Sequence, residues 1–146
     1  MSKETFRVAK RSFNSKNVLN IGAVIEKDEH SINEVIFVEV AEYGGRGIVM
    51  KFTAIDLRAL TYAMRTVLKT GASSYLKHNR SGDTKSELWV HKGEKSGYFI
   101  NAKKTGKGAL GVQFDQYRWV ALIDSLSLLA DETEKALYFY QNKLSR

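Results

Sequence analysis

The sequence has neither cysteine nor proline, and its apolar runs are short. Without cysteine, the chain has no disulfide framework, no thiol nucleophile and no cysteine-rich zinc site. No window approaches the roughly 18 apolar residues that a membrane helix needs. The three histidines lie far apart and lack any metal-ligand spacing: His30, His78 and His91. These absences predict no metal, no cofactor, and a cytoplasmic protein without membrane contact.

What the chain does contain is typical of a folded domain. Its 146 residues are 43% hydrophobic, 11% aromatic and 27% charged, which argues against fibrous and disordered classes. A chain of this length buries roughly two-thirds of its unfolded surface, so we expect a single domain over residues 1–146. The formal net charge of +7 favours nucleic acid, anionic lipid or another acidic partner, although surplus lysine also serves solubility.

The first half of the chain changes its hydrophobic period once. Alternating or β-branched segments predict strands over 17–27, 32–43 and 47–52. From Leu57 onward, apolar residues recur at helical spacing. Thr53 and Asp56 have the spacing of a capping box, and Gly71 suits a helix C-terminus. We therefore expect a helix directly after the strand that ends at Phe52.

The second half repeats this pattern. Strands are predicted around 74–78, 87–92, 97–104 and 109–114, followed by a helix that Asp115 caps. A shift of 62 residues pairs Phe37 with Phe99 and Gly44 with Gly106, and it superposes strand on strand and helix on helix. The alternative is that any two strand-and-helix units look alike.

The repeat predicts an α+β fold. Two ββββα repeats, about 1–70 and 71–130, would form antiparallel sheets braced by two helices. Asp131 and Glu134 repeat the capping-box spacing, so a C-terminal helix is expected over 131–146.

The positive charge is confined to two regions. Residues 1–16 carry five basic and one acidic residue, and residues 69–107 carry nine basic and three acidic residues. These regions have net charges of +4 and +6, whereas residues 17–68 and 108–146 have −2 and −1. The charge therefore belongs to an N-terminal arm and to the strands and turns of the second half.

Aromatic residues are interleaved with these bases, as they are on platforms that bind single-stranded nucleic acid. Alternation places Phe99, Asn101 and Lys103 on one face of a strand and Tyr98 on the other. The alternative for each ring is burial in the core. The predicted phosphate contacts are Lys77, Arg80, Lys85, Lys92, Lys95, Lys103, Lys104 and Lys107, with Arg7, Lys10 and Arg11 from the arm. The candidate stacking rings are Trp89, Tyr98 and Phe99.

Features of an enzyme are weak. The glycine-rich segments 44–47 and 105–108 do not match a phosphate-binding loop and are better explained as hairpin turns. The acidic residues show no paired arrangement typical of catalytic carboxylates. The sequence therefore predicts no catalytic residues and a protein that is not an enzyme.

The segment from Phe114 to Leu122, a strand end, a polar cap and then Trp119 and Leu122 three apart, resembles the strand-to-helix junction of the positive-cofactor-four coactivators. The repeated unit is similar to that of the Whirly family and the mitochondrial guide-RNA-binding proteins. This resemblance implies curved sheets braced by helices, homo-oligomers built through the helices, and single-stranded nucleic acid held without strong base specificity. Because several such proteins are encoded by bacteriophages, a phage protein in the host cytoplasm is one expectation.

The leading hypothesis is a single-stranded DNA-binding protein with little sequence specificity. It would act in replication, recombination or as a transcription cofactor, with a polymerase as a candidate partner. An RNA-binding protein of similar fold is one alternative. A module that binds an acidic protein is another, and in that case the strand aromatics would be buried and the segment 138–140 exposed.

Overall fold

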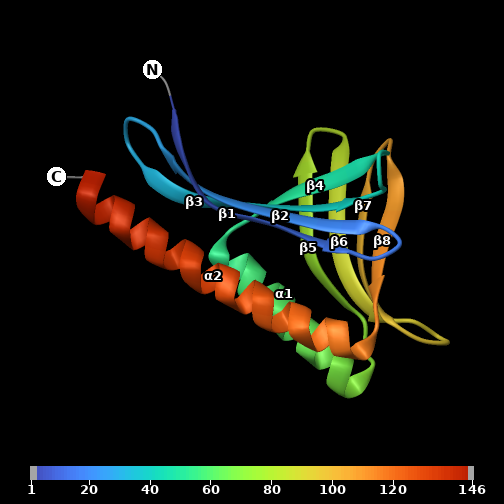
Figure 1. Cartoon of the computed structure of the whole chain (residues 1–146). Coiled ribbons are helices and arrows are strands. Elements are labelled where there is room, and N and C mark those ends of the chain that lie inside the picture. Colours follow the sequence, from blue (N-terminus) through green and yellow to red (C-terminus); the bar gives the residue numbers. More distant parts are fainter. Residues whose placement is uncertain (1–2, 145–146) are drawn as a thin grey trace.

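The computed structural model describes residues 3–144 and, for Leu144, only the backbone. It contains two four-stranded antiparallel sheets, each followed by a helix (Figure 1). The N-terminal sheet is formed by β1 (Glu4–Asn14), β2 (Val18–Lys27), β3 (Ile32–Ala41) and β4 (Gly47–Phe52), and α1 (Ala54–Thr70) follows it. The C-terminal sheet is formed by β5 (Ser74–Ser81), β6 (Thr84–Lys92), β7 (Tyr98–Lys104) and β8 (Gly108–Phe114), and α2 (Gln116–Leu144) follows it. The predicted α+β fold with two ββββα units is confirmed.

The boundaries between strands and helices are set by local capping. The Thr53 hydroxyl accepts a hydrogen bond from the Asp56 backbone N–H at 3.2 Å, and the Asp56 carboxylate accepts one from the Thr53 N–H at 2.9 Å. Gly71 ends α1 with a φ of 75° and donates its N–H to Val67, a conformation that favours glycine. Asp115 accepts a hydrogen bond from the Arg118 N–H at 2.8 Å. The predicted caps at Thr53, Gly71 and Asp115 are therefore confirmed.

Two expectations about the ends of the chain need correction. The basic N-terminal arm is strand β1, paired along its length with β2. The helix expected from Asp131 is present, but it continues α2 without interruption. Asp131 and Glu134 do not cap a new helix; both accept hydrogen bonds from Arg58 of α1.

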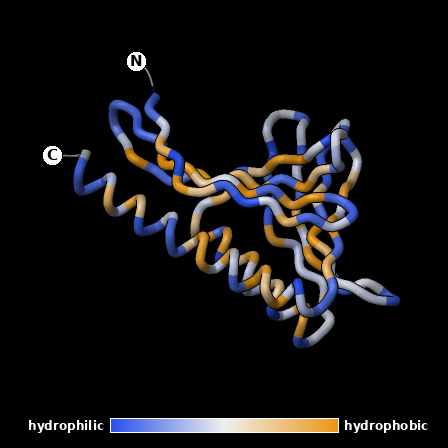
Figure 2. Tube along the Cα trace, in the orientation of Figure 1, coloured by the Kyte–Doolittle hydropathy of each residue, from blue (hydrophilic) through white to orange (hydrophobic). Residues whose placement is uncertain are grey.

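The core lies between the sheets and the helices. The strands of the two sheets run at a steep angle to each other, and α2 crosses beneath the N-terminal sheet with α1 beside it (Figure 1). Hydrophobic and hydrophilic residues alternate along the strands (Figure 2), so each sheet turns one face toward the core. Trp119 of α2 is fully buried and donates its indole N–H to the Met64 carbonyl at 3.0 Å, which joins the helices.

The opposite face of each sheet, here called its outer face, is turned away from the helices. Equivalent residues of the two repeats have equivalent environments: Phe52 and Phe114 are both buried, and Phe37 and Phe99 both lie half-buried on an outer face. The 62-residue shift also superposes the first residue of α1, Ala54, on the first residue of α2. The two outer faces are thus comparable surfaces.

Candidate nucleic-acid interface

The outer face of the C-terminal sheet carries four rings, here called the aromatic face: Tyr75, Trp89, His91 and Phe99. Tyr75 of β5 and Trp89 of β6 are cross-strand partners, and their rings stack with centroids 5.5 Å apart. Tyr75 is 70% exposed and Trp89 is half-buried. Exposed rings on a sheet are suited to stacking on nucleobases.

The second pair of rings lies closer together and more nearly parallel. His91 and Phe99 stack almost in parallel, with centroids 4.7 Å apart and an interplanar angle of 3°. The amide nitrogen Nδ2 of the largely buried Asn101 forms a hydrogen bond with His91 Nδ1, at a distance of 2.8 Å. The predicted face of Phe99, Asn101 and Lys103 is therefore the outer one, as alternation indicated.

Three of the predicted phosphate contacts lie on the same face. Arg80 pairs with Lys85 across β5 and β6, and Lys103 of β7 pairs with Glu87. All three cations are exposed. Lys85 and Trp89 are four residues apart on β6, about 13 Å along the strand. This sheet therefore has a cationic end and an aromatic end on one surface.

Lys77 does not belong to this surface. A register shift between Tyr75 and Lys77 turns Lys77 toward α1, where its Nζ lies 2.8 Å from the Asp56 carboxylate and 5.6 Å from the centroid of the Phe52 ring. Partial burial by itself would raise the pKa of Asp56, but hydrogen bonds from Lys77 and Thr53 outweigh it and hold that pKa below its ordinary value. Lys77 is thus paired with Asp56 at the start of α1.

Tyr98 is also corrected. Its ring is 7% exposed and stacks on the buried Trp119 with centroids 5.4 Å apart. Because it lies on the core side of β7, it cannot present a face to a base.

The remaining lysines of the second half are dispersed. Lys92 pairs with Tyr98 and lies on that side of the sheet, and Lys95 is exposed in the β6–β7 connection. Lys104 is half-buried and pairs with Ser86. Lys107, in the β7–β8 turn, donates from Nζ to the Gly47 carbonyl at 3.1 Å, next to the N-terminal sheet. None of these four shares the aromatic face.

Two of the three cations predicted in the arm lie together on the outer face of the N-terminal sheet. A register shift between Arg7 and Ala9 brings Arg7 and Lys10 to one face, although they are three residues apart. Arg11 then points to the other face, with its guanidinium carbon 5.1 Å from the centroid of the Phe13 ring. Arg7 and Lys10 form no ion pair or hydrogen bond within the described part of the chain.

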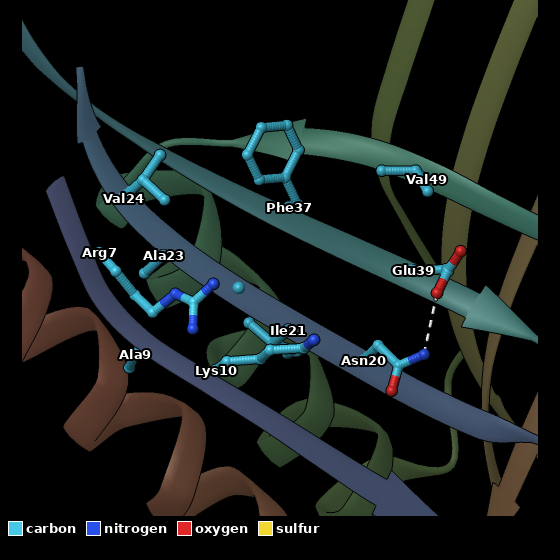
Figure 3. Close-up of a pocket in the computed structure, with 11 residues that line it drawn as sticks. Arg7, Ala9, Lys10, Asn20, Ile21, Ala23, Val24, Phe37, Glu39 and Val49 are labelled. Carbon is cyan, nitrogen blue, oxygen red and sulfur yellow. Dashed lines mark hydrogen bonds between the residues drawn. The ribbon is translucent and has the colours of Figure 1, made fainter. Parts of the chain in front are cut away.

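Arg7 and Lys10 border a groove of about 350 Å³ on this outer face. Figure 3 shows Phe37 rising from β3 on the far side of the groove, with both helices behind the sheet. Gly22 lies between Lys10 and Phe37 and is paired with both. Asn20 donates to Glu39 at 2.8 Å at one end of the groove.

Sequence reasoning missed four residues of these surfaces: Tyr75, His91, Phe37 and Gly22. Alternation around Trp89 and Phe99 could have added Tyr75 and His91, because cross-strand partners share a face. Gly22 carries little signal, since an isolated glycine in a strand pattern is usually explained by a bulge.

No family model matches the chain, and no curated protein matches its sequence. Within residues 3–144, no three or more histidine or acidic side chains are grouped so that they could hold a metal ion. Among the helices described, none is long and apolar enough to cross a membrane.

Proposed function

We propose that the protein binds single-stranded DNA with little sequence specificity through the aromatic face of its C-terminal sheet. The observation that carries this proposal is the stacked pair of Tyr75 and Trp89 on the same sheet face as the exposed Lys85 and Lys103. Rings stack on any base, and ammonium groups attract phosphates whatever the sequence. The ββββα layout is also the one implied by the resemblance to Whirly proteins.

Several features support a single strand rather than a duplex. Stacking on a ring requires an unstacked base, and each such contact is worth about 1–3 kcal/mol. The aromatic face lies on a sheet, and no described helix projects from it (Figure 1). A duplex, whose bases are stacked on one another, offers this surface only its backbone.

The experiment is a fluorescence-anisotropy titration of labelled oligothymidylate and of duplex DNA between about 50 and 200 mM salt. We expect tighter binding of the single strand and a steep loss of affinity with salt. Trp89→Ala should weaken binding about tenfold. Tyr117→Ala is the matched control, because Tyr117 is 88% exposed on α2, away from the aromatic face, and should leave affinity unchanged.

Absent binding, or binding independent of salt, would refute the proposal. The same titration with an oligouridylate separates DNA from RNA binding, because the 2′-hydroxyl is what a protein uses to distinguish them. Tighter binding of the RNA would favour the alternative of an RNA-binding protein. An action in replication, recombination or transcription rests on the family resemblance alone.

The helices support self-association as a second part of the proposal. Six apolar or aromatic side chains of the helices are more than half exposed: Ile55, Tyr62, Tyr117, Leu128, Tyr138 and Phe139. Burying apolar groups of this size against a second chain lowers the free energy of the complex. Light scattering should give a molar mass above that of one chain, and Tyr62→Glu with Leu128→Glu should reduce it. A monomer in the wild type would contradict this expectation.

A further inference from the structure

The groove on the outer face of the N-terminal sheet lies where the C-terminal sheet has the imidazole ring of His91. Phe37 and Phe99 are equivalent under the 62-residue shift. The cross-strand partner of Phe99 is His91, whose ring stacks on it at 4.7 Å. The cross-strand partner of Phe37 is Gly22, which has no side chain. The side of Phe37 that corresponds to the His91 stack is therefore unoccupied by any side chain from β2.

The fold itself does not require glycine at this position. Gly22 is not among the glycines with positive φ, and a Cβ added to it would meet no atom within 4 Å. By contrast, a Cβ on Gly111, on the other outer face, would lie 2.5 Å from Asn101 Oδ1. Glycine inside a strand lowers stability and often marks the close approach of a ligand. Gly22 thus weakens β2 without a conformational or packing reason.

The surroundings of the groove indicate the chemistry of a ligand. Lys10, Gly22 and Phe37 lie on three adjacent strands, so Lys10 and Phe37 are about 10 Å apart across the open position. Val24 and Val49 provide apolar walls. The side chains of Arg7 and Lys10 extend from β1 toward β2, whereas Glu39 belongs to β3 (Figure 3). A flat apolar ring fits beside Phe37, with an anionic group toward β1.

We propose that this groove holds one nucleotide of the bound single strand, with its base stacked on Phe37 over Gly22 and its phosphate at Arg7 and Lys10. The base takes the place that the His91 imidazole has in the C-terminal sheet. This inference rests on the proposed function and extends the bound strand from the C-terminal sheet to the N-terminal one. It assigns Gly22 the role of keeping a stacking position open.

The test fills the open position beside Phe37 with a histidine ring of the protein itself. Gly22→His recreates the pairing of His91 with Phe99 and should weaken binding of a labelled oligothymidylate long enough to reach both sheets by about tenfold. Gly22→Ala adds only a methyl group, and we expect less than a twofold change. Both variants should melt at or above the wild-type temperature, because replacing a strand glycine favours the folded state.

A double-mutant cycle identifies the ring involved. Phe37→Ala alone should weaken binding by a similar factor, and adding Gly22→His to it should cause little further loss, because the two changes remove the same stack. Unchanged affinity in Gly22→His, with the wild-type fold intact, would overturn the proposal. So would a loss in Gly22→His that is undiminished when Phe37 is absent.

The outcomes also separate this inference from the proposed function. If Trp89→Ala weakens binding and Gly22→His does not, the strand uses the C-terminal sheet only, and the groove is not part of its path. If the wild type does not bind the oligothymidylate, both ideas are wrong. Saturable binding of free thymidine monophosphate at the groove, with oligonucleotide affinity unaffected by Gly22→His, would also overturn it in favour of a small-molecule site.

Discussion

The two outer faces are built on the same strand framework but carry different side chains. At equivalent positions the N-terminal sheet has Asn20 hydrogen-bonded to Glu39, where the C-terminal sheet has Trp89 beside Asn101. The C-terminal face therefore presents rings, whereas the N-terminal face presents a groove bordered by cations. Under the proposed function, one repeated unit would supply two kinds of contact to a single strand, a raised stacking surface and a recessed one.

The largest expected effect on DNA affinity and on its salt dependence comes from removing two positive charges from one outer face or the other. Lys85→Gln with Lys103→Gln should lower the affinity for single-stranded DNA roughly tenfold at 100 mM salt and reduce the log–log salt slope by about 1.4. Arg7→Gln with Lys10→Gln should reduce the slope similarly if the strand crosses both sheets. Anisotropy titrations over a range of salt concentrations measure both quantities.

The control for these variants removes two charges elsewhere. Lys69 and Lys135 are exposed on α1 and α2, and replacing both with Gln leaves the net charge equal to that of the test variants. An equal loss of slope in this control would mean that total charge, rather than either face, sets the affinity.

A smaller effect on binding is expected at Lys77, which is two residues from Tyr75 in the chain but has its side chain on the other side of the sheet. Lys77→Gln should leave DNA affinity nearly unchanged and lower stability at neutral pH, because it removes the partner of Asp56. The folded-state pKa of Asp56 is below its ordinary value of 3.8. Its ionised form therefore contributes stability above that pH, and the contribution is lost as the pH falls through the lowered pKa.

Urea unfolding at several pH values tests this. The difference in stability between the wild type and Lys77→Gln should be largest near neutral pH and shrink below about pH 4. A variant that binds DNA markedly more weakly, with its stability unchanged, would return Lys77 to the interface.

The smallest effects compare the two strand-to-helix junctions. Thr53→Ala and Asp115→Ala each remove the side-chain acceptor at a helix N-terminus, at a cost of about 1 kcal/mol. For a chain of this size the melting temperature should fall by about 2–4 °C in each case. Oligonucleotide affinity measured below the transition should not change, and a clear loss in either variant would place that junction in the binding surface.

The features predictable from the sequence are those set by local chemistry. The caps at Thr53, Gly71 and Asp115 follow from side-chain and backbone preferences at single positions, and the structure has each of them. The face of Phe99 followed from strict alternation within one strand. The repeat itself was visible because both copies keep the same order of strands, turns and helix.

The features that could not be predicted depend on tertiary pairing. The register shifts in β1 and β5 reverse the alternation, so Arg11 and Lys77 leave the faces that their neighbours occupy. Strand β1 has a weak apolar pattern and exposes most of its side chains because it is an edge strand, so its sequence resembles that of an unpaired arm. The local spacing of Asp131 and Glu134 is that of a capping box, and nothing nearby in the sequence indicates that the true partner of Asp131 is Arg58, 73 residues away.

The two tryptophans offer the most direct measurement of the central claim. Trp89 is half-buried on the aromatic face, whereas Trp119 is fully buried in the core. A bound base can therefore stack on Trp89 but not on Trp119. We predict that single-stranded DNA quenches the tryptophan fluorescence of the wild type, that Trp89→Phe abolishes the quenching, and that Trp119→Phe retains it. Quenching that persists in Trp89→Phe, or binding without any quenching in the wild type, would contradict the account.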